Sequence, residues 1–106
     1  MSKNVVGIRR IGLYFPPDIR DSKFISDASG IPEDVIREKF GITQVHKAGE
    51  VDSVSAMAIK AAKEALCYTP PEEIDLLVYC GSEFKDYYLF NLASKVSYEL
   101  GTHAAQ

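Results

Sequence analysis

Two runs of hydrophobic residues have the pattern of β-strands. Residues 5–14 are rich in valine, isoleucine, leucine and tyrosine, and two prolines follow shortly after them. Residues 75–80 (DLLVYC) form a short, almost continuous apolar run, which predicts a strand that is covered on both faces. A third, shorter strand is expected over residues 43–47. The chain therefore has two strong strand signals and a weaker one between them.

Apolar residues at three- and four-residue spacing predict two longer helices. The first begins after Ser53, whose hydroxyl can cap it, and its apolar face is mostly alanine. Small side chains allow close contact, so we expect this helix to lie very near its neighbour. The second runs over residues 89–100 and ends at Gly101.

Two shorter helices are expected before these. The first covers residues 23–28, with Ser22 as its cap and Gly30 as its stop signal. The second begins at Pro32 and ends at Gly41, where a left-handed backbone is expected. The order strand, helices, strand, helix predicts a layered α/β fold with mostly parallel strands.

The composition narrows the class of protein. With 106 residues, the chain forms one domain at most, and 46% hydrophobic and 25% charged residues are ordinary for a globular protein. Because the net charge is -3, we do not expect the chain to bind nucleic acid. Because it has no long apolar run, we do not expect it to span a membrane. Cys67 and Cys80 form no disulfide or zinc pattern, so we expect a reducing, cytoplasmic location. We also expect Cys80 to be buried and both thiols to react slowly.

Several short motifs resemble the 3-oxoacyl-acyl-carrier-protein synthase III family of the thiolase superfamily. Each is weak alone, but their order and spacing together are fairly specific. They are the "GxYxP" of residues 12–16, the Gly41, Ile42 and His46 of a "GI-x-x-x-H" stretch, the alanine-rich helix at 56–66 followed by residues 74–80, and the helix ending in "ELG" at 95–101.

The resemblance implies a fold and a reaction. Residues 1–106 would be the N-terminal part of a thiolase-like domain, incomplete because no residue matches the family's nucleophilic cysteine. The parent enzyme would condense acyl-CoA with malonyl carrier protein by a decarboxylating Claisen reaction in fatty acid biosynthesis. Acyl-CoA and acyl carrier protein are then the implied partners, in a homo-oligomer. CoA enters as a thioester substrate, and no cofactor or metal is implied. The chain alone is expected to be inactive.

The synthase III resemblance implies two site residues, Lys39 and Leu89, and a likeness to the related hydroxymethylglutaryl-CoA synthases implies a third, Glu83. Lys39 occupies the position of an arginine that holds a CoA phosphate, while Val35 replaces the tryptophan that stacks on adenine. Leu89, in an aromatic-rich loop, would reach a partner's acyl pocket. Glu83 follows an apolar strand and a glycine, where it resembles the general acid/base of hydroxymethylglutaryl-CoA synthases.

Two alternatives stay open beside the synthase III interpretation. A hydroxymethylglutaryl-CoA synthase would use Glu83 in condensation. A small, non-catalytic interaction module would need none of these roles. Histidines 46 and 103 have no neighbouring ligand pattern, so we expect surface or hydrogen-bonded roles for them.

Overall fold

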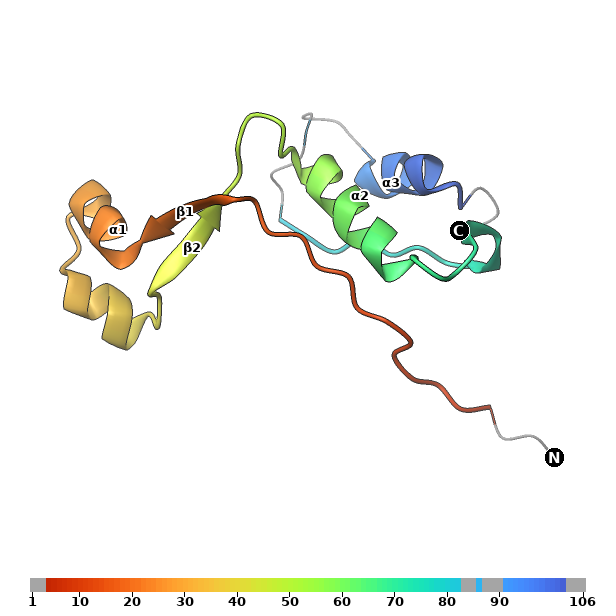
Figure 1. Cartoon of the computed structure of the whole chain (residues 1–106), viewed down its shortest axis with the longest axis horizontal. Helices are drawn as coiled ribbons and strands as arrows, with labels where there is room; N and C mark the ends of the chain where they lie inside the picture. Colours follow the sequence, from red (N-terminus) through yellow and green to blue (C-terminus); the bar gives the residue numbers. More distant parts are fainter. Residues whose placement is uncertain (1–3, 83–85, 87–90, 103–106) are drawn as a thin grey trace. The chain divides into compact units, whose positions relative to one another are not determined.

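The computed structural model describes residues 4–82, 86 and 91–102 (Figure 1). The chain divides into two compact units. We call Phe15–Asp52 the sheet unit, and we call Met1–Tyr14 together with Ser53–Gln106 the helical unit. That both belong to one condensing-enzyme domain stays a prediction.

The sheet unit holds one antiparallel pair of strands and two helical segments. The strands pair with Asp18 opposite Lys47 and Asp21 opposite Gln44. In chain order, the elements are β1 (Asp18–Asp21), α1 (Ser22–Ser29), the π-helical turn η1 (Val35–Lys39) and β2 (Gln44–Lys47). The short strand expected at residues 43–47 is thus confirmed as β2.

Helix α1 begins one residue earlier than the sequence suggested. The Asp21 carboxylate accepts the Phe24 amide at 2.8 Å and caps the helix. The prediction that Ser22 is the cap is therefore wrong, because the preceding aspartate is already extended and aimed at the first turn. Gly30 ends α1 in the left-handed conformation, as expected, with φ of 77°.

The helix expected between Pro32 and Gly41 is an irregular one. The Phe40 amide donates to the Val35 carbonyl at 3.1 Å, the five-residue spacing of a π-turn. Ile36 is fully buried in this turn. Gly41 follows with φ of 70°, which confirms the left-handed position that the sequence predicted.

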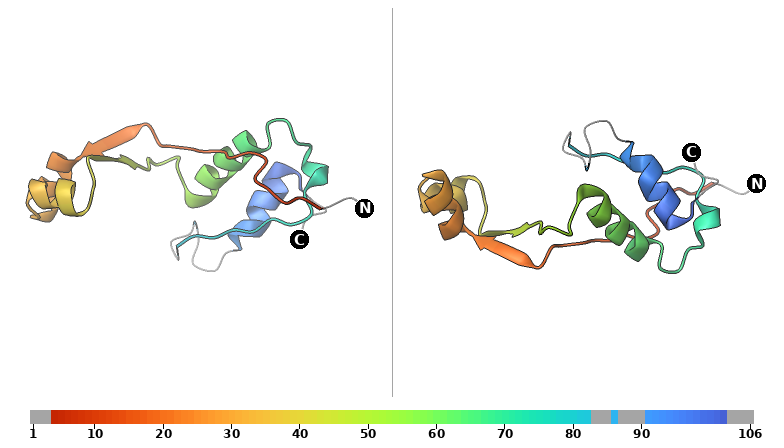
Figure 2. Two further views of the ribbon diagram at one scale, coloured as in Figure 1. Left: turned by 90° about the horizontal axis from the view of Figure 1, so that it is seen from below. Right: turned by 90° about the horizontal axis from the view of Figure 1, so that it is seen from above.

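The helical unit is built on two helices that pack together (Figure 2). They are α2 (Val54–Ala65) and α3 (Leu92–Leu100), and the 3₁₀ turn η2 (Pro71–Glu73) precedes the extended residues 74–80. The buried core consists of Leu92, Val96 and Leu100 of α3. Half-buried apolar residues from α2 and from the extended segment complete it: Val54, Ala58, Ile59, Ala62, Leu66, Leu77 and Tyr79.

The alanine-rich face of α2 makes the close approach that the sequence predicted. The extended segment around Gly12 runs so near to α2 that an added Cβ would meet the Ala61 carbonyl oxygen and the Ala65 nitrogen. Ser53 caps α2, as expected, by accepting the Ala56 amide at 3.2 Å. Gly101 ends α3 in the left-handed conformation, with φ of 78°.

The two strongest strand signals have no strand pairing among the described residues. Residues 5–14 and 75–80 are extended, and the sheet that the described residues form, β1–β2, is antiparallel. An apolar run specifies an extended chain, but a strand also needs a neighbour to accept its hydrogen bonds. The presence of helices and a small sheet agrees with a partial α/β class, and the expected mostly parallel strands are not found among the described residues.

Two expectations of burial are wrong. Leu77 and Tyr79 pack on the helices, but Leu76 and Val78 are 66% and 70% exposed, so residues 75–80 are covered on one face. Cys80 is exposed rather than buried, and Cys67 is exposed as well. Both errors follow from the same cause, since an apolar run predicts burial only when a covering layer is present.

Candidate functional site

Of the three site residues expected from the sequence, the structure describes one. Glu83 and Leu89 lie outside the described residues. Lys39 is the last residue of η1, and it is exposed. Val35 begins the same turn and is half-buried. Of the expected site residues, the structure thus locates Lys39, the residue expected to contact a phosphate of CoA.

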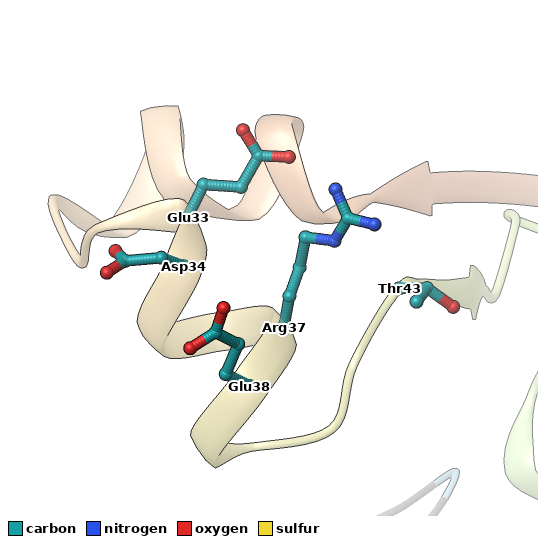
Figure 3. Close-up of a pocket in the computed structure, with 5 residues that line it drawn as sticks. All are labelled: Glu33, Asp34, Arg37, Glu38 and Thr43. Atoms are coloured by element: carbon teal, nitrogen blue, oxygen red, sulfur yellow. The ribbon is translucent and has the colours of Figure 1, made fainter.

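A surface pocket of about 610 Å³ lies beside η1, which is within the range of ligand sites (Figure 3). Its lining is polar, and neither Lys39 nor Val35 contributes to it. The lining residues are Glu33, Asp34, Arg37, Glu38 and Thr43. Sequence reasoning missed this group, although the alternation of acidic and basic residues in η1 was visible.

Hydrogen bonding fixes one side of the pocket. The buried Ser22 hydroxyl donates to the Glu33 carboxylate at 2.8 Å, and the Ser22 amide donates to the Thr43 carbonyl at 2.9 Å. Figure 3 shows the Glu33 carboxylate and the Arg37 guanidinium rising on the same side of the turn. Because three carboxylates accompany a single guanidinium, the pocket is acidic and favours hydrogen-bond donors over anions.

No cluster of histidine, cysteine and acidic residues that could hold a metal ion occurs in the described part of the chain. None of the helices described there has the length and apolar character of a bilayer span.

A second polar group surrounds Asp86 in the helical unit. The Asp86 side chain is 7% exposed, and one of its oxygens accepts the Ser55 amide at 3.0 Å. The other oxygen accepts the Ser55 hydroxyl and lies 3.4 Å from the Lys95 ammonium. The Ser55 hydroxyl, aided by the Ser55 amide and Lys95, holds the pKa of Asp86 below its usual 3.8, although burial acts in the opposite direction.

This group is suited to holding chain segments together rather than to catalysis. Ser55 is fully buried, so its hydroxyl cannot meet a substrate, and the Asp86 carboxylate to which it donates is too weak a base to activate it, because its pKa is lowered. This contact could not be predicted from local sequence patterns, because Ser55 and Asp86 are 31 positions apart.

His46 has the hydrogen-bonded role expected for it. Its Nδ1 lies 2.6 Å from the Pro16 carbonyl oxygen, and its ring packs 5.0 Å from the Phe15 ring, centroid to centroid. Two residues of the resembling motifs, Pro16 and His46, therefore meet within the sheet unit and tie the residues just before β1 to β2.

Known proteins resemble this chain over part of their own length. No family model matches the chain. A β-ketoacyl-[acyl-carrier-protein] synthase III of Rickettsia bellii (strain OSU 85-389) is 32% identical over 71 residues, which are 65% of this chain and 22% of that protein.

Two solved structures share the fold. The 3-oxoacyl-(acyl carrier protein) synthase III of Pseudomonas aeruginosa PAO1 matches with a TM-score of 0.74 and 25% identity, over 91% of this chain and 29% of its own. The priming β-ketosynthase of a polyketide biosynthetic pathway matches with a TM-score of 0.74 at 22% identity, over 92% of this chain and 29% of its own.

The chain therefore spans between 22% and 29% of the length of the proteins it matches. The likeness to the priming ketosynthase shows the fold alone, while the curated relative and the Pseudomonas structure carry the family name. Together they confirm the resemblance predicted from the sequence motifs: the chain is similar to part of the proteins of the 3-oxoacyl-acyl-carrier-protein synthase III family.

Proposed function

We propose that this chain is part of a decarboxylating condensing acyltransferase of the synthase III type. The observation that carries the proposal is the 32% identity to a β-ketoacyl-[acyl-carrier-protein] synthase III, supported by a shared fold over 91% of the chain. In the proposed reaction, an acyl group passes from CoA to an enzyme cysteine outside this chain, and free CoA leaves. Malonyl carrier protein then loses CO₂, and its carbanion attacks the acyl-cysteine to give a 3-oxoacyl carrier protein.

Within this scheme, η1 contributes to CoA binding through Lys39. An exposed ammonium at the end of a short turn can reach a phosphate as a point charge. Val35 cannot stack on adenine as an aromatic ring does, so the contact rests on charge rather than on stacking. The neighbouring acidic pocket repels phosphate, which confines the anion to the Lys39 side of the turn.

The CoA contact can be tested by titrating the chain with acetyl-CoA and following binding by calorimetry. Lys39→Ala should weaken binding by up to about fivefold, since an exposed charge contact contributes up to about 1 kcal/mol. Lys23→Ala is the matched control, because Lys23 is an exposed lysine of α1 in the same unit. Equal affinities for both variants, or no binding by the unmodified chain, would contradict the proposed contact between Lys39 and CoA.

The chain alone is expected to lack condensing activity. Its two cysteines are not at helix N-termini, where a helix dipole favours the thiolate, and Cys67 follows the C-terminal end of α2. Incubation of the pure chain with radiolabelled acetyl-CoA and malonyl carrier protein should yield no 3-oxoacyl product. Product formation would contradict the assignment of the nucleophile to another part of the enzyme.

Glu83 separates the synthase III interpretation from the hydroxymethylglutaryl-CoA one. In a synthase III, proton transfer is assigned to residues elsewhere, so Glu83→Gln in an active enzyme carrying this segment should change condensation little. Loss of about a hundredfold or more, with acylation of the cysteine intact, would instead identify Glu83 as the general acid/base.

A further inference from the structure

Helix α2 receives part of its N-terminal cap from a distant residue. The first amides of any α-helix have no acceptor within the helix. In α2, the Ser53 hydroxyl accepts the Ala56 amide at 3.2 Å, and the Ser53 carbonyl accepts the Met57 amide at 3.0 Å. The Ser55 amide donates to Asp86, at 3.0 Å and 31 positions away. Asp86 therefore completes a cap that the local sequence leaves open.

The same carboxylate also contacts α3. The Lys95 ammonium, on the first turns of α3, lies 3.4 Å from the Asp86 oxygen that accepts the Ser55 hydroxyl. The side chain is thus held from two helices at once, with 7% of its surface exposed. The positive end of α2 adds to this, since a helix N-terminus favours an anion.

We propose that Asp86 is a charge-dependent latch between the first turns of α2 and α3, which it contacts through Ser55 and Lys95. The latch needs a carboxylate, because a neutral side chain in its place loses the ion pair with Lys95. It also loses the stronger, charge-assisted form of both hydrogen bonds from Ser55.

The sign of the pH dependence follows from the contacts. Among the described residues, Lys95 is the charged group within ion-pair distance of Asp86, and α2 offers the uncharged Ser55. A carboxyl whose pKa is lowered by folding stabilises the fold above its unfolded pKa of about 3.9, and this contribution is lost as the pH falls through the lower folded value. The latch is therefore closed at neutral pH and opens in acid.

The amide proton of Ser55 reports directly on the latch, and nuclear magnetic resonance can follow its chemical shift from about pH 2 to 6. In the unmodified chain we expect one titration with a midpoint below 3.8, the ordinary value for Asp86. Ser55→Ala keeps the amide but removes the hydroxyl, the strongest contact, so the midpoint should rise towards that value. The Ala62 amide, in the middle of α2, serves as a reference for global unfolding in acid.

Asp86→Asn should abolish the Ser55 titration, because asparagine carries no proton to lose. Asp75→Asn is the matched control, since Asp75 is an exposed aspartate of the same unit, and it should leave the titration unchanged. A flat Ser55 shift in the unmodified chain, or a titration that persists in Asp86→Asn, would overturn the proposal.

Measuring Lys95→Met at two pH values covers the case in which Asp86→Asn fails to fold, because acid then removes the Asp86 charge in place of the mutation. Lys95→Met should lower the folding constant by about two- to fivefold at neutral pH, as is typical of a partly exposed ion pair, and by nothing below the midpoint. An effect of Lys95→Met that is the same at both pH values would refute the ion pair. None of these measurements involves acyl-CoA, so the latch can fail while the proposed function stands, and the reverse.

Discussion

Replacing Gly12 by alanine should loosen the contact between the N-terminal segment and α2. A Cβ at this position would lie 2.0 Å from the Ala61 carbonyl oxygen and 2.5 Å from the Ala65 nitrogen. Both atoms belong to the backbone of α2 and cannot rotate away, so the extended segment has to move outwards by more than 1 Å to restore ordinary contact. The nearby pairing of the Tyr14 ring with the Lys60 ammonium, at 4.6 Å, would be disturbed too.

The expected magnitude combines two opposing effects. Overpacking of this kind typically costs about 1–3 kcal/mol. The loss of glycine's freedom in the unfolded chain offsets about 0.4–1 kcal/mol of that cost. The net destabilisation should therefore lie between about 0 and 2.6 kcal/mol, with a middle value of about 1.3 kcal/mol, measured as a shift of the urea midpoint at constant slope.

Gly7→Ala is the matched control for this experiment. Gly7 lies in the same extended segment, no atom is within 4 Å of its added Cβ, and its φ is not positive. This variant should be unchanged or slightly stabilised. Because the segment could detach while the helices persist, the nuclear Overhauser effect between residue 12 and the Ala65 methyl group gives a local readout. Equal stability of the two variants, with that contact intact, would refute the argument from close packing.

Three further outcomes are expected. Ser53→Ala should destabilise the helical unit by about 1 kcal/mol in the same urea assay, since its hydroxyl caps α2, and no change would mean that Asp86 alone is a sufficient cap. The sequence predicted slow thiols, but Cys67 and Cys80 are both exposed, so at low protein concentration both should react with Ellman's reagent at rates near that of an unfolded control, and slow labelling of the folded chain would contradict this. The chain should self-associate, since Leu76 and Val78 are 66% and 70% exposed, and sedimentation of a monomer at high concentration would exclude it.

Local signals in the sequence predicted the ends of the helices well. Gly30, Gly41 and Gly101 each adopt the left-handed backbone expected after a helix, because only glycine does so without steric cost. Ser53 caps α2 as predicted. The failure at α1 was also local, since an aspartate stood one position before the predicted serine cap.

The candidate site was predicted less completely, because its contacts join residues that are far apart in the sequence. The resemblance singled out Lys39, and the structure places it at an exposed helix end, where a charge contact is feasible. It could not reveal the contact between Ser55 and Asp86, which joins positions 31 residues apart. Nor did the pattern of η1 show that Ser22 would donate to Glu33, because that bond depends on how α1 and η1 pack.

For the strands, the sequence predicted an extended backbone but not which faces would be covered. Residues 75–80 are apolar at nearly every position, which predicts burial on both faces, yet the structure covers only the face that carries Leu77 and Tyr79. Leu76 and Val78 would gain about 25 cal/mol for each Å² of apolar surface removed from water, so an uncovered face is unfavourable. The sequence and the structure agree if that face is covered by polypeptide beyond the described residues or by a second copy of the chain. The exposure of Cys80, at the end of the same run, would then be lost on assembly, so protection of Cys80 from thiol reagents at high protein concentration would locate the covered face.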